Sequence, residues 1–186
     1  MTWVFNRPKY PWFGFVPNHN LLNKRNPKMN LIKLLILIIF LHDVANAELI
    51  NVDSVVAQAK KENKQVLLFF HMTRCGACKE MIKTSIEDAG IRKQIDRDFL
   101  FVDMNINSKD EVIHKSFKGT VHRFAKSLGI DLYPSTIFMD GDNELKYHLV
   151  GYRDKDKFST VIEYVSTKSY KSMDLESFMN EKDFND

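Results

Sequence analysis

The sequence predicts a mixed α/β domain over residues 48–167. Helical and strand patterns alternate from Glu48 onward, as expected where helices pack on a sheet. A short apolar segment is followed at once by a Cys-x-x-Cys sequence and then by a helical pattern. Nearer the C-terminus a strong turn sequence separates two strand-like segments, which indicates a β-hairpin. The predicted order is βαβ, then a helix, then the hairpin, then a closing helix.

The N-terminal half of this domain supplies two strands and two helices. In the first helix the apolar residues recur at helical spacing, and Asp53 or Ser54 is expected to cap its start. Gln65 to Phe70 is a short run of bulky apolar residues, which is typical of a buried central strand. The predicted helices cover 52–61 and 79–91, and the predicted strands cover 65–70 and 98–105.

The segment 106–119 is polar and allows two interpretations. Ser108-x-x-Glu111 could begin a helix as a capping box, but Gly119 would interrupt any long helix there. A small hairpin or a loop fits this segment equally well.

The C-terminal half completes the sheet. Thr120 is expected to cap a helix over 121–128, and Gly129 is expected to end it. Beyond it we expect a strand over 136–139, a turn over 140–143, a strand over 144–150 that Gly151 ends, a helix over 158–165 and a polar tail over 168–186 with one helix around 173–179.

The start of the chain resembles an export signal. Leu34 to Leu41 is an unbroken apolar run of eight residues. Spanning a bilayer takes about 20 such residues, so this run fits the apolar region of a secretory signal better than a membrane span. Ala45-Asn46-Ala47 follows with the small-x-small form of a cleavage site.

These features divide the N-terminal region into two parts. We expect a signal peptide over 29–47, which begins at Met29 and is cleaved before Glu48. Residues 1–28 are interpreted as an upstream over-extension of the reading frame or a disordered leader. The alternative is an uncleaved membrane anchor over 31–41.

The net charge of +3 belongs to the leader and not to the domain. Residues 1–28 hold five basic side chains and no acidic one, and Lys33 cancels Asp43, which leaves −2 for residues 48–186. The domain carries no block of like charges, so the sequence gives no indication of a nucleic-acid surface.

The two cysteines are only three positions apart, at Cys75 and Cys78. A disulfide that closes so short a loop restrains little of the unfolded chain, because the stabilisation grows with loop length. Reactivity or metal binding explains the pair better than a structural role.

A Cys-x-x-Cys between a buried strand and a helix suits thiol chemistry. The helix N-terminus presents unpaired N–H groups and a positive potential to Cys75, and Arg74 adds a positive charge beside it. Both favour the thiolate, which is the form that attacks a disulfide. Cys78 lies one helical turn later, where it can resolve the mixed disulfide that forms.

Residues 64–83, KQVLLFFHMTRCGACKEMIK, resemble the active-site region of the thioredoxin superfamily. The segment before Gly129 is longer than in cytosolic thioredoxin and more similar to that of exported bacterial thioredoxin-related proteins. The resemblance covers about 48–167 and implies a three-layer α/β/α fold around a mixed sheet of about four strands. Four further matches follow in the expected order: Phe101-Val102-Asp103-Met104-Asn105, Leu128-Gly129-Ile130, Tyr133-Pro134-Ser135 and Gly151.

The resemblance also implies how substrate is held. Pro134 would be a cis-proline facing the dithiol, since X–Pro bonds adopt cis at small cost. Tyr133 would hydrogen-bond the substrate backbone in strand fashion. Gly76 and Ala77, between the cysteines, would contact substrate as well.

The sequence departs from the family pattern around the cysteines. Arg74 replaces the usual Trp, and Ala77 replaces the usual Pro. The buried acid expected six residues before the first cysteine is Phe69. Asp103 stands where cytosolic thioredoxins carry a lysine, and our hypothesis is that Asp103 serves as the base for Cys78, through a water where needed.

Two other functions could use the same residues. A Cu(I) carrier would hold the ion with Cys75, Cys78 and either Met72 or His71. A thioredoxin-fold interaction module would need neither cysteine. Structural zinc is disfavoured because it requires four ligands and no second Cys pair exists. We expect no cofactor and no resident metal.

The predicted activity is thiol:disulfide exchange in the periplasm, on protein or small-molecule disulfides. A dithiol in an oxidising compartment rests as the disulfide unless it is supplied with electrons. We therefore expect a reductase, more than an oxidase, that acts as a monomer and is kept reduced by a membrane donor.

Overall fold

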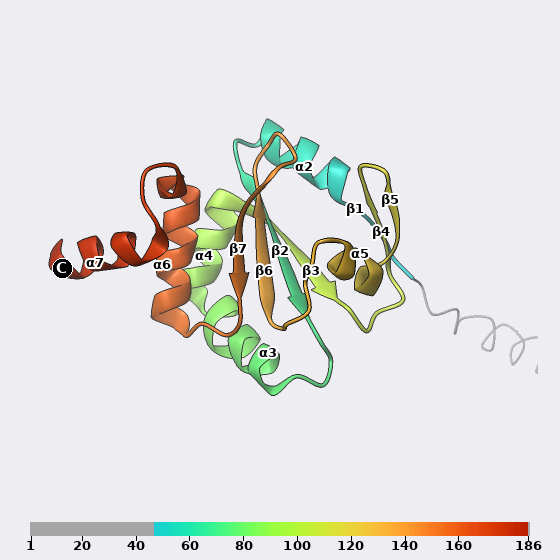
Figure 1. Ribbon diagram of the computed structural model, residues 1–186, viewed down its shortest axis with the longest axis horizontal. Coiled ribbons are helices and arrows are strands. Elements are labelled where there is room, and N and C mark those ends of the chain that lie inside the picture. The colour runs from blue at the N-terminus through green and yellow to red at the C-terminus, as the bar shows by residue number, and fades with distance from the viewer. Residues whose placement is uncertain (1–46, 186) are drawn as a thin grey trace, which may run out of the picture. The chain divides into compact units, whose positions relative to one another are not determined.

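The computed structural model describes residues 47–185, which fold around a four-stranded sheet (Figure 1). The leader over 1–28 and nearly all of the signal peptide over 29–47 lie outside the described residues. The strand order is β3-β2-β6-β7, with β2 parallel to β3 and the other pairs antiparallel. The strands are β2 (Gln65–His71), β3 (Phe99–Asn105), β6 (Ser135–Met139) and β7 (Leu145–Val150).

Helices cover both faces of this sheet, which confirms the predicted three-layer α/β/α fold. The central strand β2 is buried from Gln65 to Phe70, as its unbroken apolar sequence predicts. Its side chains alternate between two hydrophobic cores, with Leu68 in one and Phe69 in the other. The first core lies under α2 (Val52–Lys61) and α5 (Val121–Ser127), and the second lies under α3 (Gly76–Met81), α4 (Ala89–Asp98) and α6 (Lys155–Ser166).

The two helices on the first face begin at different kinds of cap. The Asn51 side chain caps α2 by accepting a bond from the Ser54 backbone N–H, so the prediction of Asp53 or Ser54 as the cap is wrong. Thr120 caps α5 as predicted. Gly129 follows α5 with a φ of +72°, a conformation that glycine adopts more easily than other residues.

The helix predicted over 79–91 is interrupted. α3 passes into the π-helical turn η1 (Ile82–Ile86), and α4 then starts afresh. Asp88 causes the restart, because its carboxylate accepts bonds from the Gly90 and Ile91 backbone N–H groups as an N-cap. A short polar side chain inside the predicted helix thus begins a second one.

A second, three-stranded sheet lies beside the first core, in the order β1-β4-β5. Of the two interpretations of 106–119, the hairpin is the one that forms, and Val112 anchors it in the first core. The short strand β1 was not predicted, because its pairing partner lies about 60 residues away along the chain. The strands are β1 (Leu49–Asn51), β4 (Glu111–His114) and β5 (Phe117–Thr120).

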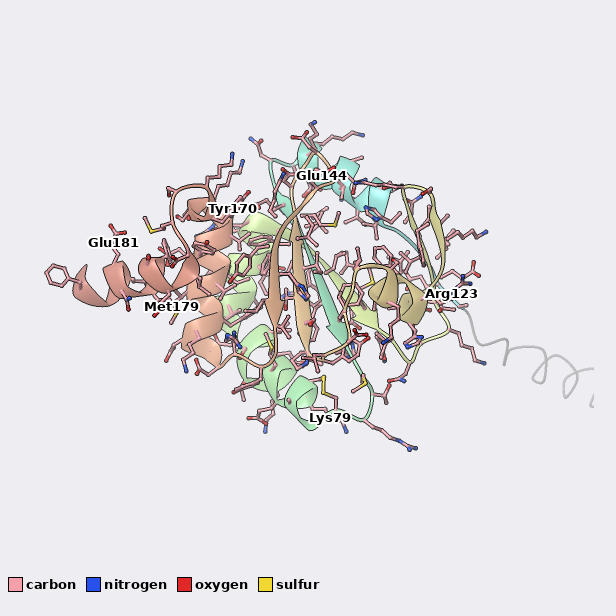
Figure 2. The ribbon with its side chains drawn as sticks, viewed as in Figure 1. Lys79, Arg123, Glu144, Tyr170, Met179 and Glu181 are labelled. Atoms are coloured by element: carbon pink, nitrogen blue, oxygen red, sulfur yellow. A yellow bond between two sulfur atoms is a disulfide. The ribbon has the colours of Figure 1, made fainter. Side chains whose placement is uncertain are left out.

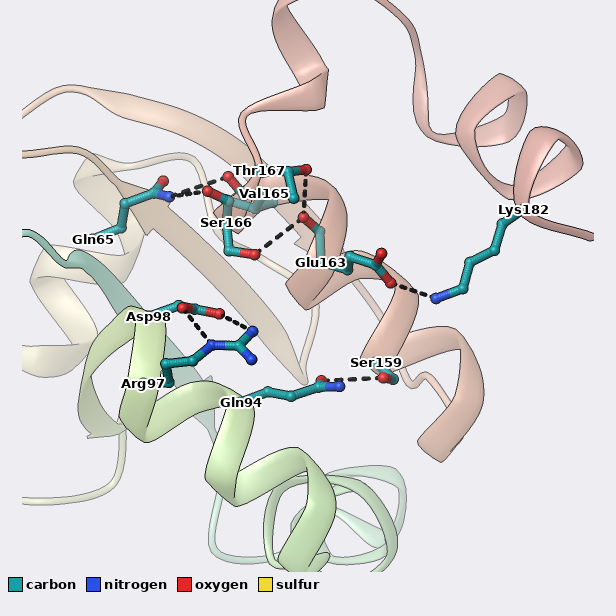
Figure 3. Close-up of polar contacts among 10 residues, drawn as sticks. All are labelled: Gln65, Gln94, Arg97, Asp98, Ser159, Glu163, Val165, Ser166, Thr167 and Lys182. Carbon is teal, nitrogen blue, oxygen red and sulfur yellow. Dashed lines mark hydrogen bonds and ion pairs between the residues drawn. The ribbon is translucent and has the colours of Figure 1, made fainter. Parts of the chain in front are cut away.

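Polar contacts join the second face of the sheet to its helices (Figure 3). The buried Gln65 side chain donates to the Val165 carbonyl over 3.1 Å, which ties the start of β2 to the end of α6. Ser159 on α6 donates to Gln94 on α4 over 3.1 Å. These contacts hold α4 and α6 side by side across the second core.

The polar tail forms two further elements, η2 (Ser169–Lys171) and α7 (Leu175–Asn185). The Tyr164 hydroxyl of α6 donates to the Met173 carbonyl over 2.8 Å. Tyr170, Leu175 and Phe178 pack against the second core. Within residues 47–185 no helix is both long enough and apolar enough to cross a membrane.

Candidate active site

The two cysteines lie where β2 ends and the helix on the second face begins. Cys75 is the N-cap of α3, and its Sγ accepts the Cys78 backbone N–H at 3.0 Å. The two sulfurs are joined as a disulfide, with their Cα atoms 5.2 Å apart. Because β2 is buried along its length, the sheet fixes the position of the segment that carries Cys75.

The two sulfur-bearing residues differ in accessibility. Cys75 is 9% exposed, whereas Cys78 is 0% exposed beneath the first turn of α3. An incoming disulfide therefore reaches Cys75 first. Gly76 and Ala77 are both exposed at the tip between them, and a Cβ on Gly76 would meet no atom within 4 Å.

Tyr133 and Pro134 lie opposite the disulfide. The peptide bond between them is cis, and the Tyr133 carbonyl oxygen is 3.9 Å from the Cys75 Sγ. The Pro134 carbonyl accepts the Gly151 backbone N–H at 2.8 Å, so the end of β7 supports this segment from behind. Burial raises the pKa of the Tyr133 phenol. The fold thus brings together residues 58 positions apart in the chain.

Asp103 lies on the same face of the sheet as Phe69, its register partner in β2. The Asp103 side chain is 58% exposed, and its Oδ1 lies 2.7 Å from Nε2 of His71, whose side chain is 12% exposed. Among the described residues the Asp103 carboxylate contacts His71 and neither cysteine. The His71 ring stacks on Phe69 with centroids 5.6 Å apart.

Two contributors to the site were missed in the sequence. The sequence suggested His71 only as a copper ligand, although the parallel register of β2 and β3 places it beside Asp103. Ser85 is fully buried, and its hydroxyl donates to the Arg153 carbonyl over 2.9 Å. That bond ties the helix after the cysteines to the loop after β7. In the sequence, Ser85 stands next to Ile86 in the predicted helix, and a polar residue on the apolar face of a helix indicates a buried hydrogen bond.

The polar residues near the site do not gather around a common centre. In the part of the chain that the structure describes, no three His, Cys, Asp or Glu side chains lie close enough together to hold a metal ion. For the proposed copper set, His71 faces Asp103 and the two sulfurs are bonded to each other.

The comparisons with known proteins agree with this geometry. The family model of the thioredoxin-like domain matches residues 52–166. A thioredoxin-fold protein from Helicobacter pylori is similar in structure, with a TM-score of 0.56 and 20% identity over 67% of this chain and 87% of that one. A thioredoxin from Thermus thermophilus has a TM-score of 0.52 and 18% identity over 66% and 88% of the two chains.

No curated protein sequence matches the chain. The two solved structures establish the fold, and the family model extends over the element order and the Cys-x-x-Cys segment described above. The paired cysteines at the start of α3 identify thiol:disulfide exchange as the chemistry of the site. The chain belongs to the thioredoxin-like domain family, within the thioredoxin superfamily.

Proposed function

We propose that this protein is an exported thiol:disulfide oxidoreductase that reduces protein disulfides in the periplasm. The observation that carries the proposal is the asymmetry of the pair: Cys75 keeps 9% of its surface exposed beside Tyr133 and Pro134, whereas Cys78 has none. A two-step exchange requires one sulfur that the substrate can reach. It also requires a second sulfur that reacts only with the first.

The reaction proceeds through two exchanges. The Cys75 thiolate attacks one sulfur of the substrate disulfide, which forms a mixed disulfide and releases the other substrate sulfur as a thiolate. The Cys78 thiolate then attacks Cys75, which releases the second substrate sulfur and leaves the Cys75–Cys78 disulfide. Two electrons pass to the substrate, and a dithiol donor in the membrane returns two electrons to the enzyme.

Substrate backbone is held at Tyr133 and Pro134 in strand fashion, with Gly76 and Ala77 against the other side of the scissile disulfide. The carbonyl of Tyr133 supports this role, because it already lies 3.9 Å from the Cys75 sulfur. Asp103 acts in the second exchange by accepting the Cys78 proton. Because the Asp103 carboxylate contacts His71 and neither cysteine, the proton reaches it through a water, and His71 holds the carboxylate in position.

Two observations support export. The leader resembles a secretory signal, and a cysteine pair that forms a disulfide suits an oxidising compartment. Sequencing the N-terminus of the protein recovered from the periplasm tests it, and we expect a start at Glu48. A chain that begins within 1–40 and stays with the membrane fraction would replace cleavage with the anchor over 31–41.

Turnover on a model protein disulfide tests the activity, and the reduction potential tests its direction. We expect catalytic reduction of the protein disulfide by a dithiol donor, with mass shifts that report the dithiol and disulfide forms. A potential near the thioredoxin value of about −270 mV supports a reductase, and one near about −120 mV an oxidase. Tight Cu(I) binding without turnover would indicate a copper carrier. A protein that neither turns over a disulfide nor binds Cu(I) would be an interaction module.

Sedimentation tests the proposed monomeric state.

A further inference from the structure

We propose that a hollow beside the disulfide binds a carboxylate of the substrate, so that the preferred substrates are protein disulfides with Asp or Glu next to the reactive cysteine. This inference rests on the proposed exchange at Cys75 and names the substrate class for that site. It concerns the segment just before the cysteines, whose Arg74 enters the exchange chemistry only as a positive charge beside Cys75.

The hollow lies beside the segment that joins the end of β2 to Cys75. It has a volume of about 400 Å³ and is lined by Met72, Thr73, Arg74 and Asn107. Three of these residues immediately precede Cys75, and Asn107 comes from the loop after β3. The Thr73 backbone N–H donates to the Asn107 Oδ1 over 2.9 Å, which joins the two walls.

Two side chains of this hollow offer free hydrogen-bond donors. The Asn107 Oδ1 accepts from the Thr73 backbone, and within residues 47–185 the Asn107 amide nitrogen has no hydrogen-bond partner, so it can donate to a ligand. The Arg74 guanidinium has five N–H donors and is exposed, and in residues 47–185 it has no ion-pair or hydrogen-bond partner. None of the four lining residues is acidic. A ligand that accepts hydrogen bonds and carries negative charge fits this set.

No acidic side chain within residues 47–185 pairs with Arg74. Asp103 contacts His71, and Asp131 pairs with Lys126. Glu80 on α3 has Lys79 beside it in sequence and Lys83 three positions later in η1. The positive charge of Arg74 is therefore not neutralised within the part of the chain that the structure describes.

The position of the hollow sets where the substrate's acid must be. Arg74 is bonded directly to Cys75, the sulfur that attacks. A substrate strand advances about 3.3 Å per residue, so a side chain one or two positions from its cysteine reaches the hollow. A carboxylate there gains charge-assisted hydrogen bonds from Arg74 and Asn107, whereas an amide of the same shape gains weaker ones.

The test compares two disulfide-linked peptides that differ only by Asp or Asn beside the reactive cysteine. The readout is the ratio of their rates of mixed-disulfide formation with the reduced full chain. We expect the Asp peptide to react about two- to fivefold faster at low salt, as for an exposed ion pair. This ratio should fall towards one at about 1 M salt, where the screening length shrinks to about 3 Å.

Three variants locate the effect. Arg74→Gln should bring the ratio close to one, and Arg74→Lys should keep part of it. Loss of the positive charge beside Cys75 also slows the reaction with both peptides, and the ratio of the two rates cancels this common effect. Asn107→Asp keeps an acceptor for Thr73 but adds negative charge, so it should lower the ratio below the wild-type value. Arg123→Gln on α5, far from α3 where Lys79 lies (Figure 2), is the matched control.

The outcomes separate this inference from the proposed function. If the wild-type chain reacts equally fast with both peptides, or if Arg74→Gln retains the full preference, the carboxylate site is wrong while the exchange activity stands. If the chain reacts with neither peptide, the proposed activity itself fails.

Discussion

At the scale of single residues, accessibility separates the two cysteines. The two residues are three positions apart, yet Cys75 is 9% exposed and Cys78 is completely buried. The difference arises because Cys75 is the N-cap, in an extended conformation, whereas Cys78 lies in the first turn of α3 with its side chain towards the sheet. In the proposed exchange, a substrate sulfur therefore bonds to Cys75 and is released by Cys78.

This asymmetry predicts opposite results for two serine variants. Cys78→Ser should accumulate a stable mixed disulfide with a substrate protein, because the sulfur that resolves it is gone. Cys75→Ser should form little or none, because Cys78 is out of reach. Non-reducing gels and intact mass measure the adduct. Equal trapping by both variants would contradict the assigned roles.

The acidic residue beside the site gives a second prediction. Asp103→Asn should slow the resolution of the mixed disulfide by about tenfold or more, because it removes the proposed proton acceptor. His71→Gln should have a similar effect, and the double variant should be no slower than either single one if the two residues act as a unit. Stopped-flow release of the substrate thiol across a pH series measures this. Unchanged rates in both variants would remove the pair from the mechanism.

At the scale of elements, the start of α2 shows which features a local sequence pattern predicts and which it does not. The length of α2 agrees with its apolar spacing, but its cap lies one position before the helix, at Asn51. Asp53, one of the two predicted caps, instead accepts from Asn143 of the β6–β7 turn and from the Lys115 backbone of the β4–β5 turn. That use of Asp53 depends on two distant turns, so the local sequence could not reveal it.

The cap assignment is testable by stability. Asn51→Ala should lower the free energy of unfolding by about 1 kcal/mol, because the Ser54 N–H loses its acceptor. Ser54→Ala is the matched control, since it keeps that N–H and removes only an exposed hydroxyl. Urea unfolding of both variants measures the difference. A larger loss for Ser54→Ala would return the cap to the residue predicted from the sequence.

Strand β7 carries a histidine whose protonation opposes folding. Burial lowers the pKa of His148 in the folded state below its usual value of about 6.5. The unfolded chain then binds a proton more readily, so stability is greatest above about pH 6.5 and falls as the pH drops through that value towards the folded pKa. His148→Asn should lose less stability than wild type between about pH 7.5 and 5.5.

Urea unfolding at several pH values measures this effect. The same replacement at His122, which is exposed on α5, is the matched control. An identical pH dependence for wild type and His148→Asn would show that burial of His148 does not influence folding.

At the scale of the whole molecule, the second core extends beyond the region that matches the family. The match ends at residue 166, yet Tyr170, Leu175 and Phe178 pack on that core, and Lys182 on α7 pairs with Glu163 on α6. The tail therefore covers apolar surface that α6 alone would leave open to water.

Removal of this tail should destabilise the fold. A chain that ends at residue 167 should lose roughly 2–4 kcal/mol of unfolding free energy, from the partial burial of three apolar side chains. A chain that ends at 182 retains all three and removes Phe184, which is 90% exposed, so it is the matched control. Equal stability of the two truncated chains would show that the tail adds nothing to the core.

The sequence by itself determined the central sheet, the flanking helices and the dithiol, because apolar spacing, turn residues and Cys-x-x-Cys are local patterns. It left open whether 106–119 is a hairpin, and it missed the break at Asp88 and the strand β1. Those features depend on hydrogen bonds between groups that are distant in the sequence. Packing of the two hydrophobic cores determines which of these groups meet, and it also places His71 beside Asp103 and Tyr133 beside Cys75.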